Sequence, residues 1–464
     1  MLSYKQALDF IHGLNRFGIK LGLHNITKLL ELLGNPHKDM KIIHVAGTNG
    51  KGSTCAMIDS ILRSAGFKVG LYTSPYLEVF NERMRINGEN ISNNDLARLT
   101  NKVREKVIYM RENDLGSPTE FEVVTAIGFL YFKEQAVDFL VIEVGMGGRL
   151  DATNVVTPLV SVITPISLDH QQYLGSTLKD IAKEKCGILK PNIPVITGPQ
   201  KPEAMAEIEE QCLSLNCSIT KVMNTESKEA ISQVITYVLK KQSIDGSKFN
   251  LINAIGKCYM DLEVALIGAH QVDNAAVAIG VIEKLASITD IVIPRDAFYK
   301  GLREVKWPGR LEVINQEPIV LLDGGHNIAG IKTLKNEVNR FFKHKRKIVV
   351  VGILEDKAYR DMIKEIVSFA NAIITTTPDS PRALSGDRLS QTVVDIFDKA
   401  VLQQHNINAT KSNVTSNEII QVYNEEKIEN AIKLAFSLAD SEDIIIFCGS
   451  LYLIGHVRKL LRNK

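Results

Sequence analysis

The chain has 464 residues, which is too long for one ordinary domain, so two or three domains are expected. Hydrophobic residues make up 45% and charged residues 23% of the chain, the balance of a globular protein with a large core. The net charge is +2, from 55 basic and 53 acidic residues, which argues against a nucleic-acid-binding surface.

The six cysteines form no C-x-x-C pair and no spacing typical of a metal site, which indicates reduced thiols. The N-terminal residues contain no continuous apolar signal segment, and no apolar stretch reaches membrane-spanning length. We therefore expect a cytoplasmic, monomeric protein whose partners are small molecules rather than nucleic acid or a membrane.

Short runs of β-branched and apolar residues alternate with longer amphipathic segments along the chain. Such runs predict strands of mainly parallel sheets that are buried on both faces. In the first half the predicted strands are KIIHVAG (41–47), FKVGLYT (67–73), VDFLVIEVG (137–145), LVSVITPI (159–166) and IPVITG (193–198). In the second half they are IVLLDGG (319–325), KIVVVGIL (347–354), NAIITTT (371–377) and DIIIFCG (443–449).

The arrangement of these strands predicts two α/β domains. Residues 245–268 alternate apolar and polar side chains, which predicts an antiparallel hairpin at a sheet edge. A helix is expected at 268–286, and the series of strands restarts after residues 295–312. We place the boundary between residues 298 and 299, and we interpret the polar stretch 379–416 as an irregular surface excursion of the second domain.

Residues 41–55 read KIIHVAGTNGKGSTC, a predicted strand followed by a glycine-rich turn and the start of a helix. The usual phosphate-loop pattern, G-x-x-x-x-G-K-[ST], would need glycine at position 45 and Ser or Thr at position 52, where this chain has Val45 and Gly52. The turn nevertheless offers backbone N–H groups and the positive end of a helix dipole, which suit phosphate. The alternatives are a glycine-rich connection without a ligand and a phosphate loop in a variant spacing. We favour the second, with Lys51 reaching the terminal phosphates of ATP and the Ser53 hydroxyl binding Mg²⁺.

Polar side chains follow three further predicted strands. Ser74 lies just past the second strand, Glu143 ends the third, and Asp169 and His170 follow the fourth. Because α/β sheets bind ligands at the carboxyl ends of their strands, these side chains are expected at the same edge as the phosphate loop. A carboxylate in that position suits a metal ion bound to a nucleotide.

The chain resembles the folylpolyglutamate synthase and dihydrofolate synthase family within the Mur ligase superfamily. Eleven matching stretches occur in family order and span roughly residues 20–458: HVAGTNGKGS, YTSPYLEVFNERMRING, SPTEFEVVTAIGF, VIEVGMGGRLDATN, ITPISLDHQQYLGSTLKDIAKEKCGILK, GAHQVDNAAVAI, WPGRLE, DGGHN, VGILEDKAY, SPRAL and CGSLYLIG. The resemblance implies an ATP-binding domain of the phosphate-loop type with a folate pocket (1–298) and a smaller, Rossmann-like glutamate-ligase domain (299–464).

The resemblance also implies ATP and two Mg²⁺ ions as cofactors, and it assigns site residues by position. Together with the phosphate loop, the expected ATP contacts are Thr48, Asn49, Gly50, Lys51, Gly52, Ser53, Asn274, Arg310 and Asp323. The expected magnesium ligands are Ser74, Glu143 and His170. The expected folate contacts are Leu21, Gly22, Thr119, Glu120, Phe121, Glu122, Leu150, Asp151 and Ala152.

Three residues are expected to act in catalysis. Lys51 would stabilise charge on the phosphoryl group during transfer. The lysine that matches Lys185 is carbamylated in the family, so its tip becomes a carboxylate-like group near the metal. His326, in DGGHN, is expected to assist on the glutamate side of the reaction.

The implied function is ATP-dependent ligation of L-glutamate to a folate (tetrahydrofolylpolyglutamate synthase) through an acyl phosphate. Whether dihydropteroate is also a substrate stays open, because Lys20 stands where some bifunctional members carry aspartate. One rival is another Mur-type amino-acid ligase, although only 46 residues precede Gly47, too few for the nucleotide-sugar-binding domain of a peptidoglycan ligase. The other rival is an ATP-dependent switch protein. A ligase releases ADP and phosphate only when a carboxylate and an amine are both present.

Overall fold

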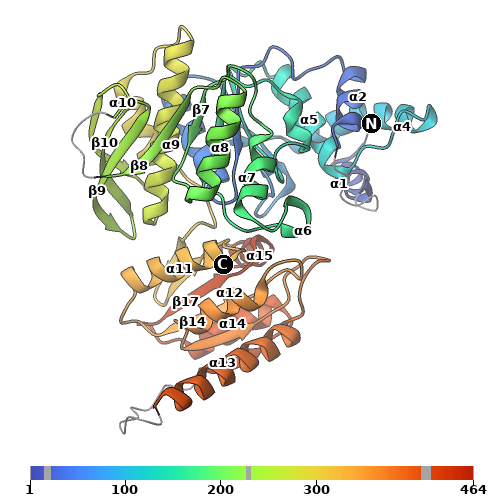
Figure 1. Cartoon of the computed structure of the whole chain (residues 1–464). Coiled ribbons are helices and arrows are strands. Elements are labelled where there is room, and N and C mark those ends of the chain that lie inside the picture. Colours follow the sequence, from blue (N-terminus) through green and yellow to red (C-terminus); the bar gives the residue numbers. More distant parts are fainter. Residues whose placement is uncertain (1, 15–21, 226–230, 409–419, 463–464) are drawn as a thin grey trace.

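The structure is a computed structural model, and it describes all residues except 1, 15–21, 226–230, 409–419 and 463–464. The chain forms two α/β units, each built around its own sheet. Figure 1 shows the larger unit above and the smaller one below, with two helices of the smaller unit along the edge that faces the larger one. The predicted α/β class with a large, mainly parallel sheet and a second, smaller sheet is confirmed.

The larger sheet has eleven strands in the order β11-β10-β9-β8-β7-β6-β1-β5-β2-β3-β4. Its strands from β9 to β2 pair in parallel, whereas β9-β10-β11 and β2-β3-β4 are antiparallel extensions at the two ends. The bounds are β1 Ile42–Ala46, β2 Val69–Tyr72, β3 Met84–Ile86, β4 Glu89–Asn90, β5 Phe139–Glu143, β6 Val160–Ile163, β7 Val195–Thr197, β8 Ile219–Asn224, β9 Val234–Ser243, β10 Gly246–Ile252 and β11 Cys258–Val264.

Helices cover both faces of this sheet, as its apolar strands require. One face packs on α3, α9 and α10, and the other on α1, α2, α4, α5, α7 and α8. The bounds are α1 Tyr4–His12, α2 His24–Leu32, α3 Lys51–Ser64, α4 Asn93–Glu112, α5 Glu120–Glu134, α6 Gln171–Leu174, α7 Leu178–Cys186, α8 Pro202–Ser214, α9 Ala269–Ile288 and α10 Arg295–Glu304.

The centre of the larger sheet is β1, which pairs with β5 on one side and with β6 on the other. The chain order reverses around this strand, because β2 and β5 lie to one side of it and β6 and β7 to the other. A crevice opens at the carboxyl ends of the strands at such a reversal, where open α/β sheets bind their ligands. The phosphate loop directly follows β1, so it lies in this crevice.

The smaller sheet has six strands in the order β12-β13-β17-β14-β15-β16, parallel except for the β12–β13 pair. Its two faces pack on α11, α12 and α13 and on α14 and α15. The bounds are β12 Glu312–Gln316, β13 Ile319–Leu322, α11 Ile328–Phe341, β14 Lys347–Val351, α12 Tyr359–Val367, β15 Ala372–Thr375, α13 Gly386–Asn408, β16 Gln421–Asn424, α14 Ile428–Leu438, β17 Ile444–Cys448 and α15 Leu451–Arg462.

All nine predicted strands are present, and the edge hairpin predicted at 245–268 is confirmed as β10 and β11. The prediction of an irregular excursion at 379–416 is wrong for residues 386–408, which form α13. Its apolar residues Leu389, Val393 and Ile396 recur at helical spacing and pack on the hydrophobic core between the smaller sheet and α11, α12 and α13. Because the residues between them are mostly polar, the apolar periodicity of this segment is too weak to predict a helix from the sequence.

The predicted domain division between residues 298 and 299 falls inside α10. This helix packs on α3 of the larger unit, where the Ser60 hydroxyl donates to the Gly301 carbonyl oxygen at 2.7 Å. The smaller sheet begins at Glu312. The two-domain division stays a prediction, and residues 305–311 connect the two sheets.

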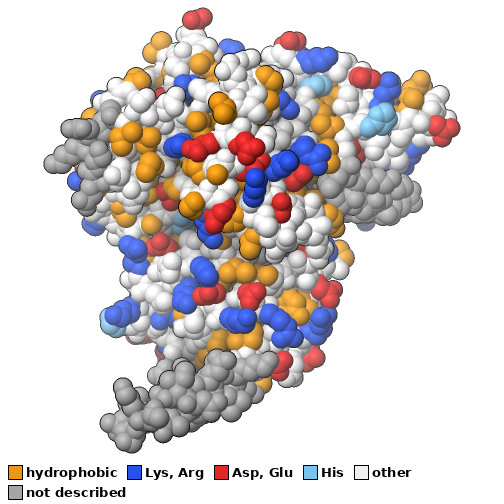
Figure 2. Space-filling view, viewed as in Figure 1, with side chains coloured by type: hydrophobic (Ala, Val, Ile, Leu, Met, Phe, Trp, Pro, Cys, Tyr) orange, Lys and Arg blue, Asp and Glu red, His pale blue; other side chains and the backbone are white. Residues whose placement is uncertain are grey.

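Among the described residues, no helix is both long and apolar enough to cross a membrane. On the face shown in Figure 2, basic and acidic side chains are interspersed over both units, in keeping with the small net charge.

Candidate active site

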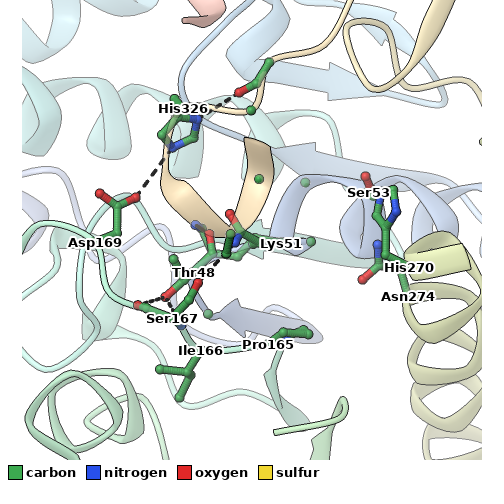
Figure 3. A pocket seen from close by; sticks show the side chains of 18 of the residues that line it. Thr48, Lys51, Ser53, Pro165, Ile166, Ser167, Asp169, His270, Asn274 and His326 are labelled. Atoms are coloured by element: carbon green, nitrogen blue, oxygen red, sulfur yellow. Dashed lines mark hydrogen bonds and ion pairs between the residues drawn. The ribbon is translucent and has the colours of Figure 1, made fainter. Parts of the chain in front are cut away.

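A cavity of about 530 Å³ lies at the carboxyl ends of β1, β2, β5 and β6. Figure 3 shows side chains from several of these strand ends and from the smaller unit pointing toward the same space. From the larger unit come Gly47–Ser53, Ser74, Glu143, Asp169, His170, Lys185 and the start of α9. From the smaller unit and the connection before it come Arg310, Asp323, His326 and neighbouring residues.

The phosphate loop owes its shape to its glycines. Gly50 has φ +86° at the N-cap of α3, a conformation that favours glycine. A Cβ at Gly47 would lie 1.8 Å from the Thr164 hydroxyl oxygen, so the loop approaches β6 too closely for any side chain. At Gly52 a Cβ would lie 2.9 Å from the ring of Trp307, which itself lies under Arg85 at 5.3 Å. The glycines of the variant spacing are therefore required by close packing at Gly47 and Gly52 and by the positive φ at Gly50.

The first part of this loop is hydrogen-bonded to the chain after β6, whereas its last part, the first turn of α3, is available for a ligand. The backbone N–H groups of Thr48 and Asn49 donate to the Pro165 carbonyl oxygen at 3.0 and 3.2 Å. The Thr48 hydroxyl donates to the Ser167 carbonyl oxygen at 3.1 Å, so both side chain and backbone of Thr48 tie the loop to the chain after β6. The first turn of α3 has no side-chain cap among the described residues. Its N–H groups and the helix dipole are thus the part of the loop best placed for an anion.

Lys51 and Glu143 lie next to each other at the floor of the cavity. Lys51 Nζ donates to the Thr48 carbonyl oxygen at 3.2 Å and lies 4.0 Å from Glu143 Oε1. The other oxygen, Glu143 Oε2, accepts from the backbone N–H of Ser74 at 3.2 Å. Burial raises the pKa of Glu143, and Lys51 opposes this effect. The carboxylate ending β5 therefore faces the lysine of the phosphate loop, as the sequence predicted.

The predicted magnesium ligands fit a hard cation through their oxygens. The Glu143 carboxylate and Ser74 line the cavity beside the phosphate loop. Among the described residues, no group of three His, Cys, Asp or Glu side chains lies close enough together to hold a metal ion by itself. This donor set suits Mg²⁺, which commonly takes one or two carboxylates and completes its shell with phosphate oxygens and water.

The predicted magnesium ligand His170 has a different neighbour here. Its Nε2 lies 3.3 Å from Lys357 Nζ, and burial and Lys357 together lower the pKa of His170 to about 4. Lys357 Nζ also donates to Asp169 Oδ1 at 2.7 Å. Burial alone would raise the pKa of Asp169, but Lys357, His326 and His170 hold it well below its ordinary value. A charged cluster thus joins the chain after β6 to the chain after β14.

His326 faces the same cluster from the smaller unit. Its Nδ1 donates to the Gly324 carbonyl oxygen at 2.9 Å, and its Nε2 lies 3.7 Å from Asp169 Oδ2. Burial and Lys357 lower the pKa of His326 to about 4, so the ring is neutral near pH 7. Because Nδ1 carries the proton, Nε2 is the nitrogen with the free lone pair, and it lies on the side of the ring that faces Asp169.

Asp323 and Arg310 flank His326. Asp323 accepts from the backbone N–H groups of Leu311 and Gly325 at 3.1 and 2.9 Å. Burial raises the pKa of Asp323, and Arg310 opposes this effect. These bonds tie the segment after Arg310 to the DGGHN loop, and both Arg310 and Asp323 line the cavity.

Lys185 is buried behind the phosphate loop rather than exposed on its helix. Its Nζ donates to the Gly47 carbonyl oxygen at 2.7 Å. Burial and the nearby charge of Lys51 lower the pKa of Lys185 to about 7. A large fraction of this amine is therefore neutral and nucleophilic near neutral pH, which is the form that reacts with CO₂.

Those predicted folate contacts that the structure describes do not line this cavity. Thr119 and Glu122 form a capping box at the start of α5, and Glu122 also accepts from the Ile26 N–H at 3.2 Å. Asp151 accepts from the Met146 N–H at 2.9 Å. The other predicted residues there are Gly22, Glu120, Phe121, Leu150 and Ala152, and Leu21 lies outside the described residues. Their role as folate contacts stays a prediction.

Sequence reasoning gave no role to Lys357 and did not name Asn327. Asn327 Nδ2 donates to Asn49 Oδ1 at 3.0 Å and to Asp169 Oδ2 at 3.1 Å, which links the smaller unit to the phosphate loop. Both residues lie within stretches that were recognised, LEDKAY and DGGHN. Asn327 lies in the loop after β13, and Lys357 lies in the loop after β14. A polar residue in a loop at the carboxyl end of a strand is the pattern by which the sequence alone could have identified both as site residues.

Two family models match the chain. The Mur ligase middle domain matches residues 45–282, and the Mur ligase, glutamate ligase domain matches residues 309–451.

Individual proteins are similar over nearly the whole chain. The dihydrofolate synthase/folylpolyglutamate synthase of Bacillus subtilis is 37% identical over 461 residues, covering 99% of both chains. The folylpolyglutamate synthase of Lacticaseibacillus casei is 38% identical over 387 residues, covering 82% of this chain and 87% of the relative. A solved structure of Mycobacterium tuberculosis folylpolyglutamate synthase complexed with ADP has a TM-score of 0.85 at 29% identity, and 98% of each chain is covered.

Proposed function

The chain belongs to the folylpolyglutamate and dihydrofolate synthase family of Mur ligases, and from this premise we propose that it joins L-glutamate to a folate at the expense of ATP. It is an ATP-dependent carboxylate–amine ligase. The observation that carries the proposal is that Lys51 and Glu143 of the larger unit share one cavity with Arg310, Asp323 and His326. A reaction in two steps needs such a site, in which phosphoryl transfer and amide formation take place side by side.

In the first step a substrate carboxylate oxygen attacks the terminal phosphorus of ATP, which forms an acyl phosphate and releases ADP. Positioning and neutralisation of charge account for most of the catalysis of phosphoryl transfer. Lys51 and the first turn of α3 bind the phosphates, and Arg310 offers a second cation from the connection between the two sheets. Mg²⁺, when bound, would be held by Glu143 and Ser74 and would neutralise phosphate charge.

In the second step the amine of glutamate attacks the acyl carbon. The tetrahedral intermediate then expels phosphate, and the amide forms once the amine has lost its proton. The His326 Nε2 lone pair is placed to accept that proton, because Nδ1–H is held by Gly324. The hydrogen-bonded ion pair of Lys357 and Asp169 lies beside this nitrogen and holds the surrounding side chains in place.

The assignments of individual residues are proposals, as are the folate pocket, two Mg²⁺ ions, a monomeric state and a cytoplasmic location. The ADP- and AMPPCP-bound relatives support ATP as the nucleotide. A further relative, from Escherichia coli, was solved in complex with DHPP and ADP, which supports the same nucleotide.

The test supplies tetrahydrofolate or dihydropteroate with ATP, MgCl₂ and L-glutamate and measures ADP, phosphate and the product mass. We expect ADP and phosphate only when the carboxylate substrate and glutamate are both present. Carboxylate labelled with ¹⁸O should deliver one labelled oxygen to phosphate, because the acyl phosphate loses that oxygen on attack by the amine. ADP release without an acceptor would instead indicate a switch-type ATPase, and product from dihydropteroate would establish the second activity.

A further inference from the structure

The first turn of α9 forms one wall of the cavity. His270, Gln271, Asp273 and Asn274 all line it. Asn274 touches the phosphate loop, because a Cβ at Gly50 would lie only 2.5 Å from Asn274 Oδ1. Asn274 also donates to Gln271 Oε1 at 3.0 Å within the helix. The position of this turn therefore determines the shape of the nucleotide site.

The helix α9 begins without a cap of its own. Its N-cap residue is Gly268, which has no side chain and has φ +109°. A side chain cannot be added there without a clash, because a Cβ would lie 2.6 Å from the His270 ring. The unpaired N–H groups of a first helical turn need an acceptor, and supplying one is worth about 1 kcal/mol in typical helices.

Glu337 supplies the acceptor from the smaller unit. Its Oε1 accepts from the Ala269 N–H at 3.1 Å, although α11 and α9 belong to different units. The side chain is only 6% exposed, and its other oxygen lies 3.6 Å from Arg340 Nε. Arg340 in turn donates to Gln242 of β9, so two consecutive turns of α11 contact the larger unit. A carboxylate at this place also matches the positive end of the α9 dipole.

The helix α11 therefore contacts both walls of the nucleotide site. Asn327, its N-cap, bonds to Asn49 in the phosphate loop, and Glu337 farther along bonds to the start of α9. Figure 1 shows α11 along the edge of the smaller unit that faces the larger one. Ile244 and Ile267 of the larger unit are partly buried against the hydrophobic core that α11 forms with the smaller sheet, so apolar contacts also join the two units here.

We propose that Glu337 is a positioning residue for nucleotide binding: it caps α9 across the contact between the two units, so that the α9 wall of the ATP site is ordered only when α11 is docked. The inference rests on the proposed function in assuming that the cavity binds ATP. The contact makes nucleotide affinity depend on how the two units are placed.

The test uses the full chain and compares three variants at the same position. Glu337→Asp is one methylene too short to reach Ala269, Glu337→Ala removes the acceptor, and Glu337→Gln keeps Oε1 in place. Binding of AMPPCP with MgCl₂ is measured by calorimetry, and KM for ATP and kcat by ADP release. We expect Kd and KM to rise about fivefold for Asp and Ala, to stay within about twofold for Gln, and kcat at saturating ATP to be unchanged.

Lys335→Ala is the matched control. Lys335 lies on the same helix, but its Nζ bonds to Glu365 Oε2 of α12 at 2.9 Å, inside the smaller unit. It should lower the thermal midpoint of α11's unit without changing the Kd for AMPPCP. The proposal is overturned if Glu337→Asp and Glu337→Ala bind AMPPCP like the unmodified chain, or if Lys335→Ala weakens binding equally. A chain that binds AMPPCP but forms no amide would refute the proposed function while leaving this comparison intact.

Discussion

Lys357 and Asp169 are 188 positions apart in the chain, yet Lys357 Nζ donates to Asp169 Oδ1 at 2.7 Å with both side chains almost fully buried. The pair joins the loop after β14 of the smaller sheet to the loop after β6 of the larger sheet. Its neighbours His170 and His326 are both held neutral by burial and by the charge of Lys357.

We expect Lys357→Met to destabilise the protein by about 3 kcal/mol, because it leaves a buried carboxylate without its cation. The double variant Lys357→Met/Asp169→Asn should recover part of this loss. Lys364→Met is the control, since Lys364 bonds to Asp361 at 2.8 Å with both side chains exposed, and it should cost less than about 1 kcal/mol. Denaturant unfolding of the three variants and the unmodified chain measures these losses, and equal losses for the buried and exposed lysines would contradict the prediction.

Glu143→Ala should reduce ligation at least tenfold, a loss of about 1.4 kcal/mol or more of transition-state stabilisation. The physical reason is that the carboxylate beside Lys51 would no longer bind Mg²⁺·ATP. The dependence of ADP release on MgCl₂ should also shift to higher concentration. A matched buried glutamate, Glu207 on α8, can be changed to Gln as a control for folding. Activity above a tenth of normal in Glu143→Ala would argue against a metal-binding role.

Lys185→Ala should be inactive, whereas Lys185→Glu should keep part of the activity, because glutamate places a fixed carboxylate near the position of a carbamate. Short-chain carboxylic acids should partly restore the alanine variant. In the unmodified chain, ¹³C-labelled bicarbonate should give a carbamate NMR signal that Lys185→Ala lacks. Full activity of Lys185→Ala without any added acid would rule out the modification.

The same lysine predicts a dependence of stability on pH in protein freed of bicarbonate. The folded-state pKa of about 7 lies below the ordinary value of 10.5, so between these values the unfolded chain binds the extra proton. Burial of the Lys185 ammonium therefore lowers the free energy of unfolding by its full amount below about pH 7. This loss of stability disappears as the pH rises toward about 10. Lys185→Met should be more stable than the parent near pH 7, and the difference should shrink toward pH 10. A difference independent of pH would contradict the lowered pKa.

Arg310→Ala should raise KM for ATP about tenfold, or about 1.4 kcal/mol, although Arg310 lies outside the phosphate-loop sheet. The reason is that it brings the second cation to the cavity from the connection between the sheets. Arg346→Ala serves as the control, because Arg346 bonds to the Leu438 carbonyl oxygen away from the cavity. Unchanged nucleotide affinity in Arg310→Ala would show that the WPGR segment only anchors the connection.

The fold was predictable from sequence wherever local pattern and burial agree. The apolar runs ending in Ala46 and Glu143 became neighbouring buried strands, as their composition requires. The helix α13 was missed because polar residues separate its few apolar contacts. No strand is predicted at Val234–Ser243, where β9 lies, because only its residues 235–237 are buried and the rest are half-buried or exposed, so neither alternation nor a continuous apolar run extends along it.

The site was predictable only in part, for a different reason. Residues at strand ends, such as Glu143, could be placed because strand topology brings them to one edge. Lys357 and Glu337 act through partners that are distant in sequence, and no local pattern reports such pairs. The predicted folate contact Glu122 engages in capping and backbone bonds, which residue type alone could not reveal.

Trp307 is the only tryptophan in the chain, and its ring packs against Gly52 in the first turn of α3 and against the guanidinium of Arg85. The protein therefore contains an intrinsic fluorophore packed against the first turn of α3, with no second tryptophan to obscure its emission. Arrival of a polyanion at the turn would change the electric field on the indole, so the emission of unlabelled protein can follow nucleotide loading in real time.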